Sequence, residues 1–352
     1  MAYTTIDDPT IYFNTVLYTG DDSTSNAISG VGFQPDWVWL KNRSAEAGHQ
    51  LADVVRGKSG TNFLSLSSDT NAAEAAQGDN DGLNTLGSDG FTVGFTNSTG
   101  WNKSGNNYAS WNWKAGGSAS SNTDGSLTSS VSANQTAGFS IVKWSPSGSG
   151  SAKTIGHGLG EVPKMIIMKR YSGTVNWFVY HVGTGNGNAT FLDTTDASTS
   201  VNYWNSTTPT SSVFTVNGAA EASGDFIGYC FAEKQGFSKI GQYTGNGNVD
   251  GAFVYTGFKP AWLLTKRLDS ATSGNWNISD NKRDPSNVVT QIFFADDAQS
   301  ELTASNVYDY YSNGFKVRES GAGTNASGST YIYMAFAESP FVNSNKVPNN
   351  AR

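Results

Sequence analysis

Residues Gly32–Arg43 read GFQPDWVWLKNR, and two variants of this segment occur later in the chain. The variants are GLGEVPKMIIMKR at Gly158–Arg170 and GFKPAWLLTKR at Gly257–Arg267. In each copy a proline precedes an apolar run, and a lysine lies six residues after that proline (Pro35–Lys41, Pro163–Lys169, Pro260–Lys266). Proline favours extended structure around it and is tolerated at the start of a strand, so each copy predicts one core strand.

Two further cues accompany every copy. The segments GFTVG, VFTVNG and GFKVRE surround Phe91, Phe214 and Phe315, and each unit closes with two aromatic residues five positions apart: Tyr108–Trp113, Phe226–Phe231 and Tyr331–Phe336. Self-similarity at this period predicts three variants of one module, each of ordinary domain size. We place the modules at residues 13–117 (module 1), 139–236 (module 2) and 237–340 (module 3). Residues 1–12 are then a leader, 118–138 a flexible Gly/Ser/Thr-rich linker, and 341–352 a tail expected to pack on a partner subunit.

The composition favours an all-β fold. The chain has 352 residues with 40 Gly, 12% aromatic and only 14% charged residues, and turn-forming segments separate short apolar runs. We predict tandem antiparallel β-sandwich modules with jelly-roll or Greek-key-like connections. Short helices are expected only at 70–77 and 298–304. The repeated apolar positions predict a core that includes Trp37, Trp39, Trp113, Ile166, Phe231, Trp262 and Phe336, with the lysine and arginine that follow each run in solvent.

Charge and sequence composition exclude several roles. The net charge of −7 does not suit a protein that neutralises phosphates, so no nucleic-acid partner is expected. The start MAYTTIDDPT lacks the basic and apolar regions of a signal peptide, and no apolar run has the length of a bilayer span. The single cysteine, Cys230, has no partner for an intrachain disulfide.

No catalytic residues are predicted. His49, His157 and His181 occupy different places in the repeats, and no GxSxG segment accompanies them. Glu233 and Glu338 are the best candidates for paired glycosidase carboxylates, but both follow a closing strand in the same FAE context, which favours a structural role. We therefore expect a protein that is not an enzyme.

No cofactor is expected either, with calcium as the one alternative. The loop GDNDGLNTLGSDG at 78–90 is acidic but lacks the ligand spacing of an EF-hand. An irregular calcium site built from Asp79, Asp81 and Asp89 is the alternative to a solvated turn.

Four tryptophans lie near Gly/Asn/Ser-rich segments, where an exposed ring could stack on a sugar. They are Trp101, Trp177, Trp204 and Trp276. The alternative is that they pack against a neighbouring module or partner, because aromatic residues also dominate interfaces.

The motifs of the first module resemble a known family. GFQPDWVWLKNR followed by DVVRG (53–57), SDGFTVG (88–94) and YASWNWKAGG (108–117) resembles the repeated module of virion structural proteins from marine bacteriophages of the cyanophage and pelagiphage type. The start at 3–20 and the end at 336–352 also resemble those proteins. Module 2 departs from the pattern, because Met165 stands in place of the tryptophan and no VRG segment follows.

The resemblance implies a structural protein of a virion, and two positions on the particle remain open. One is a tail-fibre or appendage adhesin that contacts the host surface, expected to be its glycan; the other is a decoration or knob-like protein on the phage head. A glycan-cleaving depolymerase is a third alternative. The implied partners are other virion proteins and further copies of the chain, with a trimer as the usual fibre state. The protein would be made in the host cytoplasm and lie at the virion surface, without membrane insertion.

Overall fold

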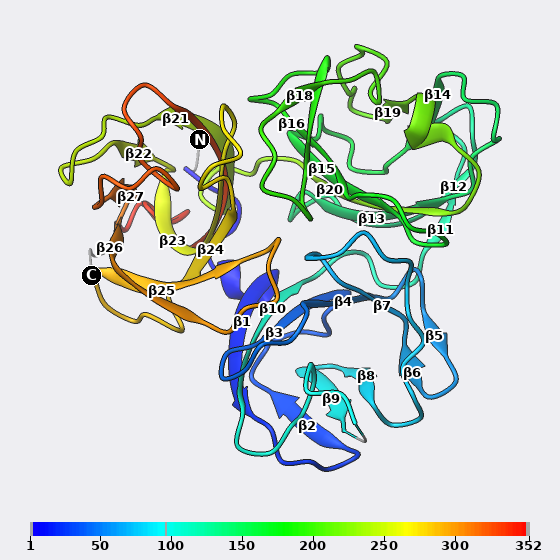
Figure 1. Cartoon of the computed structure of the whole chain (residues 1–352), viewed down its shortest axis with the longest axis horizontal. Coiled ribbons are helices and arrows are strands. Elements are labelled where there is room, and N and C mark those ends of the chain that lie inside the picture. Colours follow the sequence, from blue (N-terminus) through cyan, green and yellow to red (C-terminus); the bar gives the residue numbers. More distant parts are fainter. Residues whose placement is uncertain (1–2, 96, 350–352) are drawn as a thin grey trace.

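The computed structural model describes residues 3–95 and 97–349, and its regular elements are strands with two short 3-10 helices, η1 (Pro9–Ile11) and η2 (Gly218–Glu221). The fold is all-β and antiparallel, as the sequence predicts. Figure 1 shows three lobes around a common centre: module 1 in blue and cyan, module 2 in green, and module 3 in yellow to red.

Module 1 contains a five-stranded sheet in the order β1-β10-β3-β4-β7, a three-stranded sheet β2-β9-β8 and the pair β5-β6. Its strands are β1 (Phe13–Thr19), β2 (Asn26–Ser29), β3 (Trp37–Asn42), β4 (Gln50–Asp53), β5 (Lys58–Ser59), β6 (Asn62–Phe63), β7 (Ser65–Leu66), β8 (Gly82–Gly87), β9 (Gly90–Gly94) and β10 (Asn107–Trp113).

Module 2 contains an eight-stranded sheet in the order β11-β12-β13-β20-β15-β16-β17-β18 and the pair β14-β19. Its strands are β11 (Ser120–Asn122), β12 (Ser129–Asn134), β13 (Phe139–Trp144), β14 (Lys153–Gly156), β15 (Met165–Arg170), β16 (Phe178–His181), β17 (Asn188–Phe191), β18 (Thr199–Ser200), β19 (Val213–Val216) and β20 (Phe226–Phe231).

Module 3 forms one curled eight-stranded sheet in the order β21-β28-β23-β24-β25-β26-β27-β22. Its strands are β21 (Ser238–Thr244), β22 (Phe253–Tyr255), β23 (Phe258–Arg267), β24 (Trp276–Asp280), β25 (Val289–Phe294), β26 (Leu302–Tyr311), β27 (Gly314–Val317) and β28 (Thr330–Pro340).

The same four-strand order occurs in all three modules: an opening strand, the closing aromatic strand, the strand of the proline motif and the strand that follows it. These sets are β1-β10-β3-β4, β13-β20-β15-β16 and β21-β28-β23-β24. The register is conserved as well, because Trp37 pairs with Trp113, Met165 with Phe231, and Trp262 with Phe336. The repeated sequence cues therefore mark equivalent places in one strand framework.

Both faces of the proline-motif strands β3, β15 and β23 are buried, which explains why their apolar runs do not alternate with polar residues. Along β3, Trp37 and Trp39 point to a core shared by all modules, whereas Val38 and Leu40 point into the core of module 1. Strand β15 divides its side chains in the same way, with Met165 and Ile167 central and Ile166 and Met168 in the core of module 2. A short continuous apolar run is the pattern expected of such a strand.

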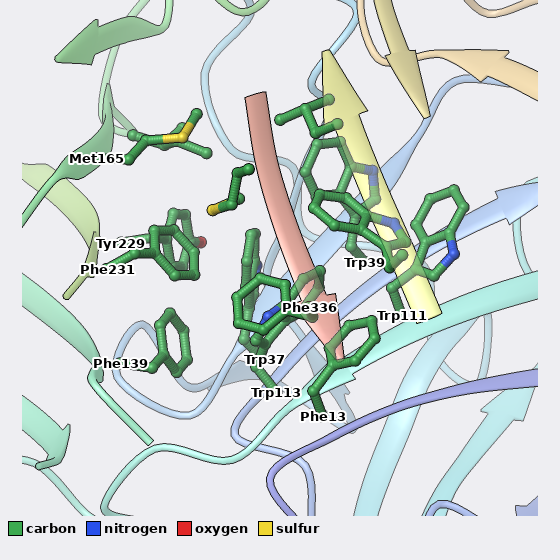
Figure 2. Close-up of a cluster of buried hydrophobic side chains, with 14 of the residues drawn as sticks. Phe13, Trp37, Trp39, Trp111, Trp113, Phe139, Met165, Tyr229, Phe231 and Phe336 are labelled. Carbon is green, nitrogen blue, oxygen red and sulfur yellow. The ribbon is translucent and has the colours of Figure 1, made fainter. Parts of the chain in front are cut away.

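The shared central core is rich in aromatic rings. Trp37 stacks on Tyr229 of module 2 with ring centroids 4.3 Å apart, and Trp113 meets Trp262 of module 3 edge-on at 5.6 Å. Phe231 and Phe336 close the third contact at 6.1 Å. Figure 2 shows these rings of modules 1 and 2 converging with Phe336. All seven residues predicted for the core are buried, so that prediction is confirmed.

Three local expectations are wrong. The 118–138 segment is not a free linker, because β11 and β12 pair with each other and β12 pairs with β13 at the edge of the module 2 sheet. Its Ser and Thr side chains suit an edge strand, since one face of such a strand stays in solvent. Residues 70–77 form a loop with one bridge at Ala75, and residues 302–304 begin strand β26, so neither predicted helix forms.

The leader and tail are both attached to the body of the protein. Ile6 lies in the central core, and the Thr4 hydroxyl donates to the carbonyl of Gln235 at 2.7 Å. In the tail, the Phe341 amide donates to the carbonyl of Gly257, and the Ser344 side chain bonds Asp7. Docking of the tail on a partner subunit stays a prediction.

Replacing Trp37 with alanine is expected to lower the free energy of unfolding by about 3–5 kcal/mol, because it empties a ring-sized space between modules. Urea denaturation of the full-length variant and wild type measures this difference in the free energy of unfolding. The matched control, Val249→Ala at a residue 62% exposed, should stay within about 0.5 kcal/mol of the wild type. Equal effects of the two substitutions would contradict the central position of Trp37.

Candidate functional site

The three lysines of the repeated motif are buried at the boundaries between modules, so the expectation that they are solvated is wrong. Each Nζ donates to a carbonyl of a neighbouring module: Lys41 to Ala298 at 2.7 Å, Lys169 to Asn71 at 3.0 Å and Lys266 to Thr194 at 3.3 Å. Module 1 thus reaches module 3, module 2 reaches module 1, and module 3 reaches module 2. The contacts form a closed ring of equivalent junctions.

A second residue accompanies each lysine, at the first position of the next strand or directly before it, and its side chain bonds across the same boundary. His49 Nε2 donates to the carbonyl of Phe294 at 2.9 Å, while Trp177 Nε1 bonds Ser67 and Trp276 Nε1 bonds Phe191. A carboxylate of the same module holds the amide of each residue at 2.7–2.9 Å; these are Asp69, Asp193 and Asp296. Trp177 and Trp276, two of the tryptophans proposed for sugar stacking, therefore donate hydrogen bonds across the module junctions.

All four proposed stacking residues are buried, with exposed fractions of 0% for Trp101 and Trp177 and 1% for Trp204 and Trp276. Trp101 lies in the core of module 1 and Trp204 in that of module 2. A sugar needs an accessible ring face, so the glycan-stacking prediction is wrong for these four. Gly/Asn/Ser-rich flanking segments do not indicate an exposed ring, because loops of this composition also cover buried tryptophans.

A buried ion pair completes two of the junctions. Arg56 Nε donates to Asp53 Oδ2 at 2.6 Å, and the Tyr229 hydroxyl of module 2 donates to the same oxygen at 2.9 Å. In module 3, Arg283 binds Asp280 at 2.5 Å, and Trp111 Nε1 of module 1 donates to Asp280 at 3.0 Å. The DVVRG segment at 53–57 contains the first of these pairs.

The third junction uses a different chemistry at the same register position. His181 pairs with Met165 as Asp53 pairs with Trp37, so His181 stands where the other modules have aspartate. The neighbouring module offers Met334 where the others offer Trp111 or Tyr229, and its thioether has no proton to donate. His181 Nε2 instead donates to the backbone carbonyl of Tyr333 at 3.2 Å, and Nδ1 accepts from the amide of Gly183 at 2.9 Å.

Burial shifts the titration of these groups strongly. It lowers the pKa of Lys41, Lys169 and Lys266 to about 8, although the charges of Asp69, Asp193 and Asp296 act against the shift. Burial also lowers the pKa of His49 and His181 to about 4 and raises that of Asp193 to about 6. Displaced pKa values often mark reactive sites, but these groups are enclosed and bonded across module boundaries, which indicates a structural role.

The other ionisable groups named from the sequence are bonded or buried as well. Glu233 forms ion pairs with Lys164 and Lys239, and Glu338 with Lys259 at 3.0 Å. His157 Nε2 bonds the carbonyl of Thr210 at 3.1 Å, and burial lowers its pKa. Cys230 is buried in the module 2 core, and its burial raises the thiol pKa.

The proposed calcium ligands serve separate turns. Asp81 accepts from the amide of Ser98, Asp89 from those of Gly30 and Gly32, and Asp79 lies beside Thr61. Within residues 3–95 and 97–349, no group of three His, Cys, Asp or Glu residues is placed to hold a metal ion. The same residues include no helix long and apolar enough to cross a membrane.

The family described as "Domain of unknown function (DUF7483)" matches residues 8–340. The chain belongs to the DUF7483 family. No curated protein and no solved structure matches it. The match runs through all three modules, so the DUF7483 unit contains the whole ring of junctions.

Sequence reasoning missed the junctions of this DUF7483 chain, although one signal was available. The lysine recurs at the same distance from the proline in all three copies, whereas the position of a solvated charge can vary from one repeat to the next. The DVVRG segment has a counterpart in DNKR at 280–283, with the same spacing between aspartate and arginine. A charged residue fixed in three repeats predicts a buried, bonded group.

Arg56→Met is expected to lower the free energy of unfolding by about 3–5 kcal/mol, because it leaves the buried Asp53 charge without its partner. Chemical denaturation of the variant gives the value. Lys103→Met is the matched control, since it breaks the exposed Lys103–Asp22 pair, which contributes about 1 kcal/mol or less. Similar losses in both variants would show that the Asp53–Arg56 pair is no more than a surface pair.

The buried histidines predict a loss of stability in acid. The folded-state pKa of His181 lies near 4, below the value of about 6.5 of an unfolded chain, so the unfolded state takes up its proton first as pH falls. The contribution of His181 to the free energy of unfolding is therefore fully present above pH 6.5 and declines as the pH falls toward 4. His181→Gln should remove about 3 kcal/mol of this decline, because glutamine does not titrate. Denaturation at several pH values tests this, and parallel curves for variant and wild type would contradict it.

Proposed function

We propose that the protein is a non-enzymatic structural protein of the phage virion surface, of the tail-fibre or appendage type, which contacts the host cell through its surface glycan. The sequence resemblance of the module to virion proteins supports this role. The observation that carries it is the closed ring of junctions, in which the buried ionisable groups join modules instead of facing an accessible cleft.

The mechanical consequence of that ring suits a particle component. Two modules joined by a linker could hinge, but here each module is bonded to both of its neighbours and shares the central core with them. Relative movement of any one module would break hydrogen bonds at two junctions. A rigid block holds surface residues at fixed distances, which favours repeated weak contacts with a cell surface.

A hydrolytic role has less support. A glycosidase needs two accessible carboxylates on either side of the bond it cleaves. Glu233 and Glu338, the candidates from the sequence, are held by lysines at the strand ends. We therefore assign no reaction to them.

Decoration of the phage head is the second candidate, and the three-lobed arrangement favours it. Three equivalent modules around one centre match the threefold positions of an icosahedral shell (Figure 1). A single chain would then occupy a site of threefold symmetry. The trimer usual for fibres stays part of the first proposal.

Cryo-electron microscopy of the virion with a bound antibody fragment against the protein separates the two positions. We expect the fragment on the tail or an appendage. Fragments distributed over the head would overturn the appendage role in favour of decoration. Absence of the protein from particles purified by density gradient would overturn both.

A further inference from the structure

One surface of module 3 carries exposed aromatic rings that the fold does not require. Strand β22 lies at the edge of the sheet beside β27, which pairs with β26. On β22, Phe253 lies opposite Lys316 of β27 and Tyr255 lies opposite Gly314 of β27. Tyr311 of β26, the strand on the other flank of β27, also lies opposite Gly314. These residues share one face of the sheet, because residues directly opposite each other point to the same side. We call Phe253, Tyr255, Tyr311 and Tyr3 the aromatic face.

The rings are accessible and held in place. Phe253 is 49% and Tyr255 52% exposed. Phe253 and Tyr311 lie edge to face with centroids 6.0 Å apart, and the Tyr3 hydroxyl lies 3.1 Å from that of Tyr255 while it donates to the carbonyl of Gly257. Gly314 forms the floor between the rings. A Cβ there would lie 2.1 Å from the carbonyl oxygen of Val254, so this floor stays free of a side chain.

Modules 1 and 2 show that the framework is stable without these rings. Val254 pairs with Phe315 as Ile28 pairs with Phe91 in module 1, so Phe253 and Tyr255 correspond to Ala27 and Ser29. Tyr311 corresponds to Gly87, since each pairs with the glycine that starts the next strand. In module 2 the equivalent residues are Thr154 and Gly156. Large exposed rings at these positions are therefore particular to module 3.

We propose that the aromatic face is the carbohydrate-binding site of the protein, with sugar rings stacked on Phe253 and Tyr255. The proposal rests on the proposed function and specifies where the host glycan is bound. The C–H face of a pyranose is apolar and fits a flat aromatic ring, while its hydroxyls need donors and acceptors at the edge. The ion pairs Lys316–Asp250 and Arg318–Asp309 supply both kinds of group beside the rings.

The size of the face favours a glycan over a protein partner. An aromatic side chain offers about 150–250 Å², so two half-exposed rings provide on the order of 200 Å², whereas each side of a stable protein interface covers about 800 Å². The surroundings are polar, with the loop TGNGNVDG at 244–251 next to β22. A narrow apolar strip bordered by hydroxyl, amide and charged groups matches a few sugar rings.

The test compares full-length wild type with the double variant Phe253→Ala/Tyr255→Ser, which copies the residues of module 1 and so preserves the framework. Val162→Ser, at a residue 44% exposed in module 2, is the matched control. The probes are intact host cells and their purified, protein-free surface polysaccharide. We expect the double variant to bind the polysaccharide at least about tenfold more weakly and the control to bind as wild type. Tyr255→Phe, which keeps the ring, should stay within about threefold.

Each other outcome overturns a different statement. Equal binding of polysaccharide by wild type and double variant would overturn the aromatic face as the site and leave the proposed host contact intact. Binding to cells that survives removal of polysaccharide but disappears after protease treatment would replace the glycan with a protein receptor. Binding of wild type to neither probe would overturn the proposed host contact together with this site. Unchanged thermal unfolding of the double variant shows that any loss is local.

Discussion

Each strand of the proline motif has two apolar faces, and a single module can cover only one of them. In β3 the face with Val38 and Leu40 is covered within module 1, whereas Trp37 and Trp39 face outward from it. Left in water, such a strip of tryptophan would be a strongly apolar surface. The other modules present equivalent apolar strips, Met165 and Ile167 in module 2 and Trp262 and Leu264 in module 3. The three strips bury one another in the central core (Figure 2).

The polar junctions follow from this arrangement. Lys41 continues the central face of β3, so burial of Trp37 and Trp39 takes its ammonium out of water as well. The carbonyls of Ala47 in module 1 and Ala298 in module 3 replace its hydration. The same reasoning applies to Asp53, which is neutralised by Arg56 and reached by Tyr229. At the third junction both sides change together: module 2 has His181 in place of aspartate, and module 3 offers the backbone carbonyl of Tyr333. The requirement is therefore a hydrogen-bond partner for each buried ionisable group at the junctions and not a particular residue.

The sequence predicts the all-β class, the repeat and the core positions, because these depend on local pattern. Trp37 and Trp262 recur at one distance from a proline, which is enough to place them inside. The sequence does not predict that the second face of each strand packs against the other modules. A continuous apolar run is equally typical of a strand buried inside a single β-sandwich. Trp177 lies in a loop-like context, yet the deciding contact is with Ser67 of another module. The sequence does not single out Phe253 and Tyr255, because their alternation with Val254 is ordinary for a strand and their exposure depends on the edge position of β22.

The central claim is that the three modules form one folding unit because they share a core. Hydrogen exchange measured by mass spectrometry at increasing sub-denaturing urea tests it directly, since each peptide reports the free energy of opening of its own strand. We expect peptides from β10, β20 and β28 to converge on the same opening free energy and the same urea dependence. A module whose strands open at lower free energy, with a smaller urea dependence than the others, would show that it unfolds alone and would contradict the account.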